Sequence, residues 1–179
     1  YKNMKKLNQY PVTDYNKFPQ NYYFLSIVKE IIKIANLDKS KKIILDYGCG
    51  KKIFSKYLPD KKILNYDINP LFSEIKNYKN HYFDLVIFNH VLMYLTPTRI
   101  NELLVEIKKK NPKCEIILSL SRQNLISKIA MILSFNFKAH EKTKSSYFEQ
   151  IEQLNNKTKI IRKKLGVFGI TDIFYCEFK

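Results

Sequence analysis

The chain has 179 residues, a length that suits one domain with one hydrophobic core. Its apolar share of 45% is ordinary for a globular protein, and the absence of any apolar stretch of about 18 residues argues against a membrane span. The formal charge of +16 would suit a nucleic acid, an acidic membrane surface or an anionic substrate. Lysines spread along the whole chain supply nearly all of that charge, however, so a basic surface that faces solvent is the favoured interpretation.

The cysteines carry no recognisable pattern. Cys49, Cys114 and Cys176 are odd in number and widely spaced. This spacing argues against a disulfide framework and against a zinc site, so no metal is expected. The simplest prediction is a cytoplasmic protein in a reducing compartment.

Residues 1–21 are polar and rich in aromatic side chains, and Pro11 and Pro19 keep them irregular. They are predicted to form an N-terminal aromatic arm, followed by a single domain over residues 22–179. The arm either folds across the ligand site as a lid or packs as a satellite cluster on the edge of the domain.

Beyond the arm, segments with helical spacing alternate with short apolar runs. Helices are predicted over residues 22–36, 52–58, 97–110, 125–135 and 146–154, and strands over 41–47, 62–68, 83–89, 115–121, 157–165 and 170–178. The last two strands read as a hairpin. This order predicts an α/β fold with a doubly wound, mostly parallel sheet and an antiparallel C-terminal hairpin.

A glycine turn follows the first predicted strand. Gly48 and Gly50 allow a tight turn and a close approach of the backbone to a ligand. Asp67 ends the second strand, where an acid can accept hydrogen bonds from two ribose hydroxyls. A dinucleotide site would need a third glycine where Ile53 stands, and Asp46 would repel its pyrophosphate. S-adenosylmethionine (SAM), with a cationic amino group and a sulfonium, suits an acid at position 46.

Three segments resemble class I SAM-dependent methyltransferases of the small-molecule type. Leu-Asp-Tyr-Gly-Cys-Gly at 45–50 resembles motif I, Asn-Tyr-Asp-Ile-Asn-Pro at 65–70 resembles motif II, and residues 83–92 resemble the fourth-strand motif. The resemblance implies a Rossmann-like methyltransferase fold and SAM as the cofactor. It also implies transfer of a methyl group to a hydroxyl or amine of a small-molecule acceptor.

The resemblance further implies which residues form the site. The residues expected to bind the cofactor are Asp46, Gly48, Cys49, Gly50, Asp67, Ile68 and Asn89. His90 and His140 are candidate catalytic residues, because a histidine near neutral pKa can take a proton from the acceptor. The alternatives are a packing or cofactor-edge role for His90 and a surface-loop position for His140.

Two features depart from the family pattern. Lys52 stands where the family usually has glycine, and residues 70–82 leave too little chain for the third strand and its acidic loop, so that strand is predicted to be reduced or absent. Two alternative functions follow. The charge suggests an RNA- or protein-directed methyltransferase, and the two departures suggest a catalytically inactive partner protein with the SAM fold.

Overall fold

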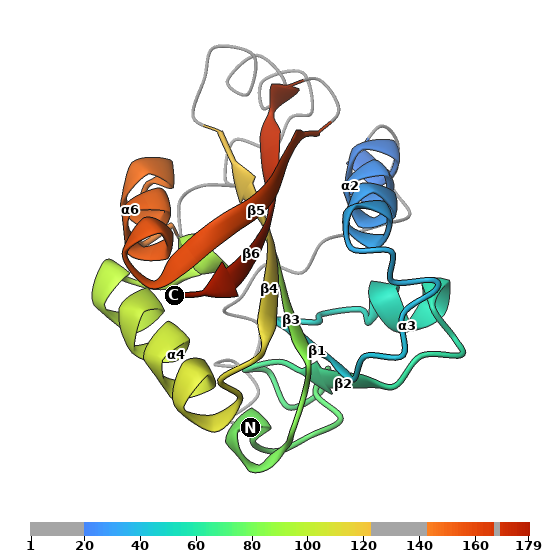
Figure 1. The fold of residues 1–179 in the computed structure, drawn as a ribbon. Helices are drawn as coiled ribbons and strands as arrows, with labels where there is room; N and C mark the ends of the chain where they lie inside the picture. The colour runs from blue at the N-terminus through green and yellow to red at the C-terminus, as the bar shows by residue number, and fades with distance from the viewer. Residues whose placement is uncertain (1–19, 123–142, 167–168) are drawn as a thin grey trace, which may run out of the picture.

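The computed structural model describes residues 20–122, 143–166 and 169–179, which form a six-stranded sheet between two sets of helices (Figure 1). The strand order is β2-β1-β3-β4-β6-β5. Strands β1 to β4 run parallel to one another, whereas β6 is antiparallel to both β4 and β5. The predicted doubly wound, mostly parallel sheet with an antiparallel C-terminal hairpin is therefore confirmed.

The elements follow the predicted order. The strands are β1 (Ile44–Tyr47), β2 (Ile63–Tyr66), β3 (Leu85–Asn89), β4 (Glu115–Ser121), β5 (Thr158–Leu165) and β6 (Thr171–Phe178). The α-helices are α2 (Gln20–Ile34), α3 (Ile53–Tyr57), α4 (Pro97–Lys110) and α6 (Tyr147–Lys157), and two short 3-10 helices are η1 (Tyr78–Asn80) and η2 (Leu92–Tyr94). The helix predicted over residues 125–135 and most of the aromatic arm lie outside the described residues. No described helix is long and apolar enough to cross a membrane.

Two apolar cores lie on opposite faces of the sheet. Helices α2 and α3 cover one face, and α4 and α6 cover the other (Figure 1). Successive side chains of a strand point to opposite faces, so β1 sends Ile44 into the first core and Leu45 into the second. The parallel strands are therefore apolar on both sides, and polar side chains gather where the strands end.

The chain forms no strand between β2 and β3, a stretch that the structure describes completely. Strand β2 is consequently an edge of the sheet, with backbone groups that need partners. The backbone N–H groups of Glu74 and Ile75 donate to the Asn65 carbonyl at 2.9 and 3.4 Å, and the Asp67 N–H donates to Ser73 Oγ at 3.1 Å. Residues 73–75 thus provide hydrogen-bond partners for some of the backbone groups that a third strand would otherwise pair with.

Aromatic rings from β1, β2 and η1 pack together beside this edge strand. The ring of Tyr78, in η1, lies with its centroid 5.0 Å from that of Tyr66 and 5.2 Å from that of Tyr47. Its hydroxyl donates to Glu106 Oε2 on α4 at 2.6 Å. Burial, and then this pairing with a carboxylate, raise the pKa of Tyr78 above its ordinary value. Tyr78 therefore ties the connection that replaces the third strand to helix α4.

We expect Tyr78→Ala to lower the free energy of unfolding by about 3–5 kcal/mol, because it leaves a cavity where a buried ring packed. Tyr78→Phe keeps the ring and loses only the bond to Glu106, so its cost should be about 1–3 kcal/mol. Tyr82→Ala, at an exposed ring in the same connection, is the control and should cost less than either. Urea denaturation measures all three. Equal losses in Tyr78→Ala and Tyr82→Ala would contradict the structural role of Tyr78.

Candidate functional site

The predicted cofactor residues lie at one end of the sheet, at the carboxyl ends of the parallel strands. Asp46 is in β1 and pairs in register with Asn65 of β2 and Ile87 of β3. Gly48 follows β1, and Asn89 is the last residue of β3. Carboxyl ends of parallel strands are where doubly wound sheets bind ligands.

The glycine turn has backbone conformations that suit glycine. Gly48 and Gly50 have φ angles of +79° and +47°. The N–H groups of Gly48 and Cys49 donate to the Tyr66 carbonyl at 2.8 and 3.1 Å, which extends the pairing of β1 with β2 into the turn. A Cβ at Gly48 would lie 2.4 Å from Val91 Cγ2, so any side chain there would collide with the segment that follows β3.

The carboxylate of Asp67 holds the glycine turn. Its Oδ2 accepts a hydrogen bond from the Gly50 N–H at 2.9 Å, and its Oδ1 accepts from the Asn69 N–H at 2.8 Å. An ionised carboxylate has about four lone-pair directions, so each oxygen can still accept from a ligand. The next side chain, Ile68, is 63% exposed and offers an apolar surface beside the acid.

Asp46 is a buried acid with an unsatisfied oxygen. The residue is 2% exposed, and no hydrogen-bond partner for its Oδ2 lies in the described part of the chain. Burial, and to a smaller extent the negative charge of Asp67, raise the pKa of Asp46 to about 8. A cation placed beside Asp46 would offset both effects and would complete the hydrogen bonding of Oδ2.

Lys52 has a backbone conformation that favours glycine. Its φ is 55°, in the left-handed region, and it caps the N-terminus of α3. The left-handed conformation costs a non-glycine residue about 1–2 kcal/mol. The Lys52 ammonium lies 2.8 Å from Glu74 Oε1, and Asn65 Nδ2 donates to Glu74 Oε2 at 2.7 Å. These hydrogen bonds, from Asn65 and then from Lys52, lower the pKa of Glu74.

Asn89 and His90 are fixed by serines of the neighbouring strand. Ser119 Oγ donates to Asn89 Oδ1 at 2.7 Å, and the His90 N–H donates to Ser119 Oγ at 3.0 Å. The ring Nδ1 of His90 lies 2.9 Å from Ser121 Oγ. His90 has a φ of 55°, a strained conformation that is common at functional sites.

Helix α2 contributes aromatic side chains near the same strand ends. The Phe24 ring meets the His90 ring edge to face, with centroids 5.8 Å apart, and the Tyr23 ring lies 6.3 Å from it. The Tyr23 hydroxyl bonds to the Thr171 hydroxyl at the start of β6. Burial raises the pKa of Tyr23, so this phenol stays protonated. The N-terminal half of α2 therefore packs over the end of β3.

The two remaining predicted site residues are Cys49 and His140. Cys49 lies in the glycine turn, but its thiol is buried, and burial raises its pKa, which keeps it in the unreactive thiol form. His140 lies outside the described residues.

Sequence reasoning missed Ser119, Ser121 and Thr171. The alternation of serine with leucine at the end of β4 was a usable signal for Ser119 and Ser121, because both side chains leave the strand on one face. Thr171 gave no such signal, since its position depends on the antiparallel pairing of Thr171 with Ser121.

No family model and no curated protein sequence matches the chain. Solved structures do match its fold. A protein from Pyrococcus horikoshii aligns with a TM-score of 0.68 at 14% identity, covering 98% of this chain and 99% of that one. Magnesium protoporphyrin IX methyltransferase from Synechocystis aligns at 0.63 and 13% identity, over 99% and 94% of the chains. A SAM-dependent methyltransferase from Archaeoglobus fulgidus aligns at 0.61 and 18% identity, over 87% and 94%.

The chain therefore has the fold of class I SAM-dependent methyltransferases. The likeness that the sequence motifs predicted is confirmed at the level of the fold.

The raised pKa of Asp46 predicts how stability changes with pH. The folded chain keeps a proton on Asp46 up to about pH 8, whereas the unfolded chain releases it near pH 4. Stability should therefore fall as pH rises from about 5 to 8, and Asp46→Asn should remove that part of the fall. We expect the variant to gain at least about 1 kcal/mol relative to the parent across this range, measured by urea denaturation at each pH. Parallel profiles for the two proteins would contradict the assignment.

Proposed function

We propose that the chain is a SAM-dependent methyltransferase that transfers a methyl group to a hydroxyl or amine of a small-molecule acceptor. The observation that carries the proposal is the unsatisfied Oδ2 of Asp46 beneath the glycine turn, next to Asp67. Two carboxyl groups at this place suit a ligand with a cationic end and disfavour a pyrophosphate. The methyltransferases of similar fold include a magnesium protoporphyrin IX enzyme with bound S-adenosylhomocysteine and a glycopeptide N-methyltransferase complexed with the same product.

The residues of the site fit the parts of SAM. Gly48 and Gly50 let the turn approach the methionine part, where Asp46 accepts from the amino group. Asp67 accepts from the ribose hydroxyls, and Ile68 covers one face of the adenine with its exposed side chain. Asn89, held by Ser119, lies toward the methyl end. SAM supplies an electrophilic methyl group when bound.

The protein's part in the transfer is to orient the acceptor and to accept its proton. His90 is the proposed base, because the contact of its Nδ1 with Ser121 fixes the ring next to the end of β3. The aromatic rings of α2 that pack on His90 shield this place from water. His140 remains a second proposed base, in a segment that the structure does not describe.

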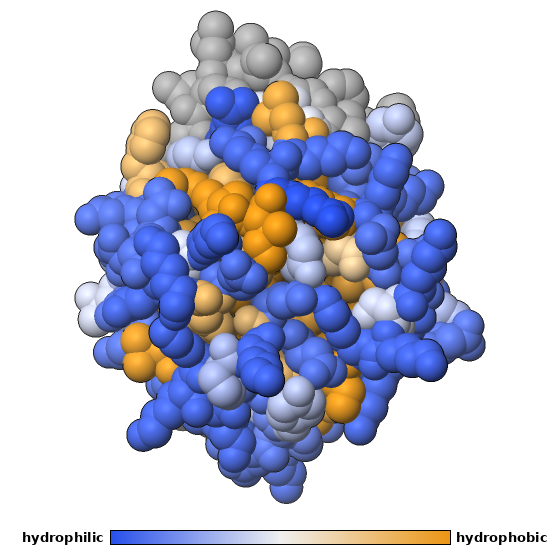
Figure 2. Space-filling model, viewed as in Figure 1, coloured by the Kyte–Doolittle hydropathy of each residue, from blue (hydrophilic) through white to orange (hydrophobic). Residues whose placement is uncertain are grey.

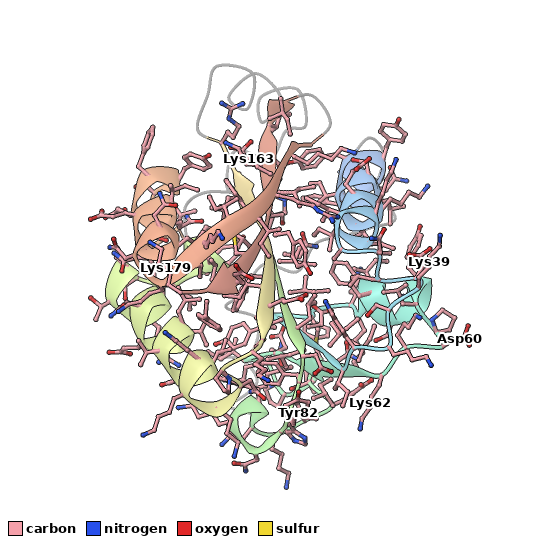
Figure 3. All side chains as sticks on the ribbon, in the orientation of Figure 1. Lys39, Asp60, Lys62, Tyr82, Lys163 and Lys179 are labelled. Atoms are coloured by element: carbon pink, nitrogen blue, oxygen red, sulfur yellow. The ribbon has the colours of Figure 1, made fainter. Side chains whose placement is uncertain are left out.

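The distribution of lysines supports a small-molecule acceptor over a nucleic acid. Lys39, Lys62, Lys163 and Lys179 project from different sides of the molecule (Figure 3). The face in Figure 2 is hydrophilic over most of its area and is broken by small hydrophobic patches. A nucleic acid that tracks its backbone along a protein needs a continuous basic stripe.

Titration calorimetry with SAM and S-adenosylhomocysteine tests the proposal. We expect both to bind, and we expect Asp67→Ala to weaken SAM binding by about 1–3 kcal/mol, the cost of losing charge-assisted hydrogen bonds. Asp60→Ala removes an exposed acid elsewhere (Figure 3) and should bind like the parent. A thermal melt of each variant checks that it is folded. No binding at millimolar ligand would overturn the proposal, and unchanged affinity in Asp67→Ala would move the ribose contact elsewhere.

The charge state of Asp46 gives an independent readout of the cationic contact. At about pH 6.5 its carboxyl group is mainly protonated, since its pKa is about 8, and a bound ammonium favours the ionised form. Binding of SAM should therefore release close to one proton, measured by calorimetry in buffers of different ionisation enthalpy. Asp46→Asn should abolish the release. A parent protein that binds SAM without releasing a proton would place the amino group away from Asp46.

A further inference from the structure

A second buried acid, Asp172, lies at the same carboxyl end of the parallel strands but on the opposite face of the sheet, toward α6. Asp172, the second residue of β6, is 1% exposed. The Tyr147 hydroxyl of α6 donates to its Oδ2. The same oxygen lies 3.3 Å from Lys163 Nζ and 3.7 Å from Arg122 Nε. Three groups from three different elements thus converge on one carboxylate.

Strand pairing brings these side chains together. Asp172 is opposite Leu120 of β4, and the Arg122 N–H donates to the Ile170 carbonyl at 2.7 Å, which continues the β4–β6 ladder past the end of β4. Lys163 of β5 is opposite Phe174, and its ammonium lies 5.1 Å from the centre of that ring. Because residues two apart share a face of the sheet, Arg122 and Lys163 flank Asp172 on the side of α6.

The cluster has more positive than negative charge. Two cations accompany one carboxylate, and the side chains of Arg122 and Lys163 are 40% and 51% exposed. Arg122 approaches Asp172 through Nε, and within the described residues its two terminal nitrogens donate to no protein group. The 3.7 Å separation of Nε from the carboxylate is an ion pair and no hydrogen bond, and the planar guanidinium can present its terminal nitrogens as a fork, the geometry that binds a carboxylate or phosphate with two hydrogen bonds.

We propose that Arg122 and Lys163 bind an anionic group, a carboxylate or a phosphate, on the methyl acceptor. This proposal rests on the proposed function, since it assumes that an acceptor lies where the parallel strands end. Strand β4 is adjacent to β3, which ends in Asn89 and is followed by His90. Neighbouring strands are about 4.8 Å apart and β4, β6 and β5 follow β3 in the sheet, so Arg122 lies one strand and Lys163 three strands from the end of β3. An acceptor that reaches both cations from His90, which packs against α2, therefore crosses the carboxyl end of the sheet to the face of α6. The buried Asp172 keeps the two cations at this place.

The test uses phenyl phosphate and benzoate as probes on protein saturated with S-adenosylhomocysteine, with binding measured by calorimetry. We expect at least one probe to bind in the millimolar range, and the tighter one shows which anion the site prefers. Arg122→Gln should weaken that binding at least about tenfold, as expected for the loss of a charge-assisted pair. Lys39→Gln removes one positive charge from an exposed side chain far from Lys163 and should change the affinity less than about twofold (Figure 3).

Two results would overturn the proposal. The first is a parent protein that binds neither probe, and the second is an equal loss of affinity in Arg122→Gln and Lys39→Gln, which would reflect the general charge of the chain. Failure of the proposed function would appear separately, as absence of S-adenosylhomocysteine binding before any probe is added. A thermal melt of Arg122→Gln with bound S-adenosylhomocysteine, equal to that of the parent, shows that a lost probe signal does not come from unfolding.

Discussion

The hydrogen bond from the Gly50 N–H to the Asp67 carboxylate is the contact on which the rest of the site depends. It joins the turn after β1 to the turn after β2, two segments that parallel pairing brings side by side. Asp67 also accepts from the Asn69 N–H, so one carboxylate sets the path of both turns. With the turns fixed, Asp46 is closed off from water beneath them, and its high pKa is a direct consequence of that enclosure.

The missing third strand and Lys52 in the glycine turn are structurally linked. An edge strand needs partners for its backbone groups, and residues 73–75 provide them to Asn65 and Asp67. Glu74, in that segment, is held by the ammonium of Lys52. The left-handed conformation of Lys52 costs conformational free energy that a glycine would not lose. The ion pair of Lys52 with Glu74 anchors the shortened connection and offsets part of this cost. Lys52 thereby joins the turn to the segment that replaces the strand.

The sequence was sufficient for those features that depend on local pattern. The bounds of β4 and α4 were predicted to the residue, and the Thr96 cap with Pro97 at the first helical position accounts for where α4 begins. Asp46, Asp67 and Asn89, which the family resemblance grouped into one site, lie at the carboxyl ends of neighbouring parallel strands. The Asp172 cluster could not be predicted, because it depends on the register of β6 against β4 and β5. The packing of Phe24 on His90 could not be predicted either, because it joins distant parts of the chain.

The charges along this edge are arranged by sign, although the chain as a whole is strongly basic. The ends of β2 and β1 carry Asp67 and Asp46, the second of which becomes negative when a cation binds beside it, whereas Arg122 follows β4 and Lys163 lies in β5. Charges close to a bound ligand act through a lower effective dielectric than the lysines of the outer surface, so the local signs decide its orientation. A cationic cofactor is favoured at the acidic end and an anionic acceptor at the basic end. The proposed methyl transfer then takes place between them, at the end of β3, where His90 is held by Ser121.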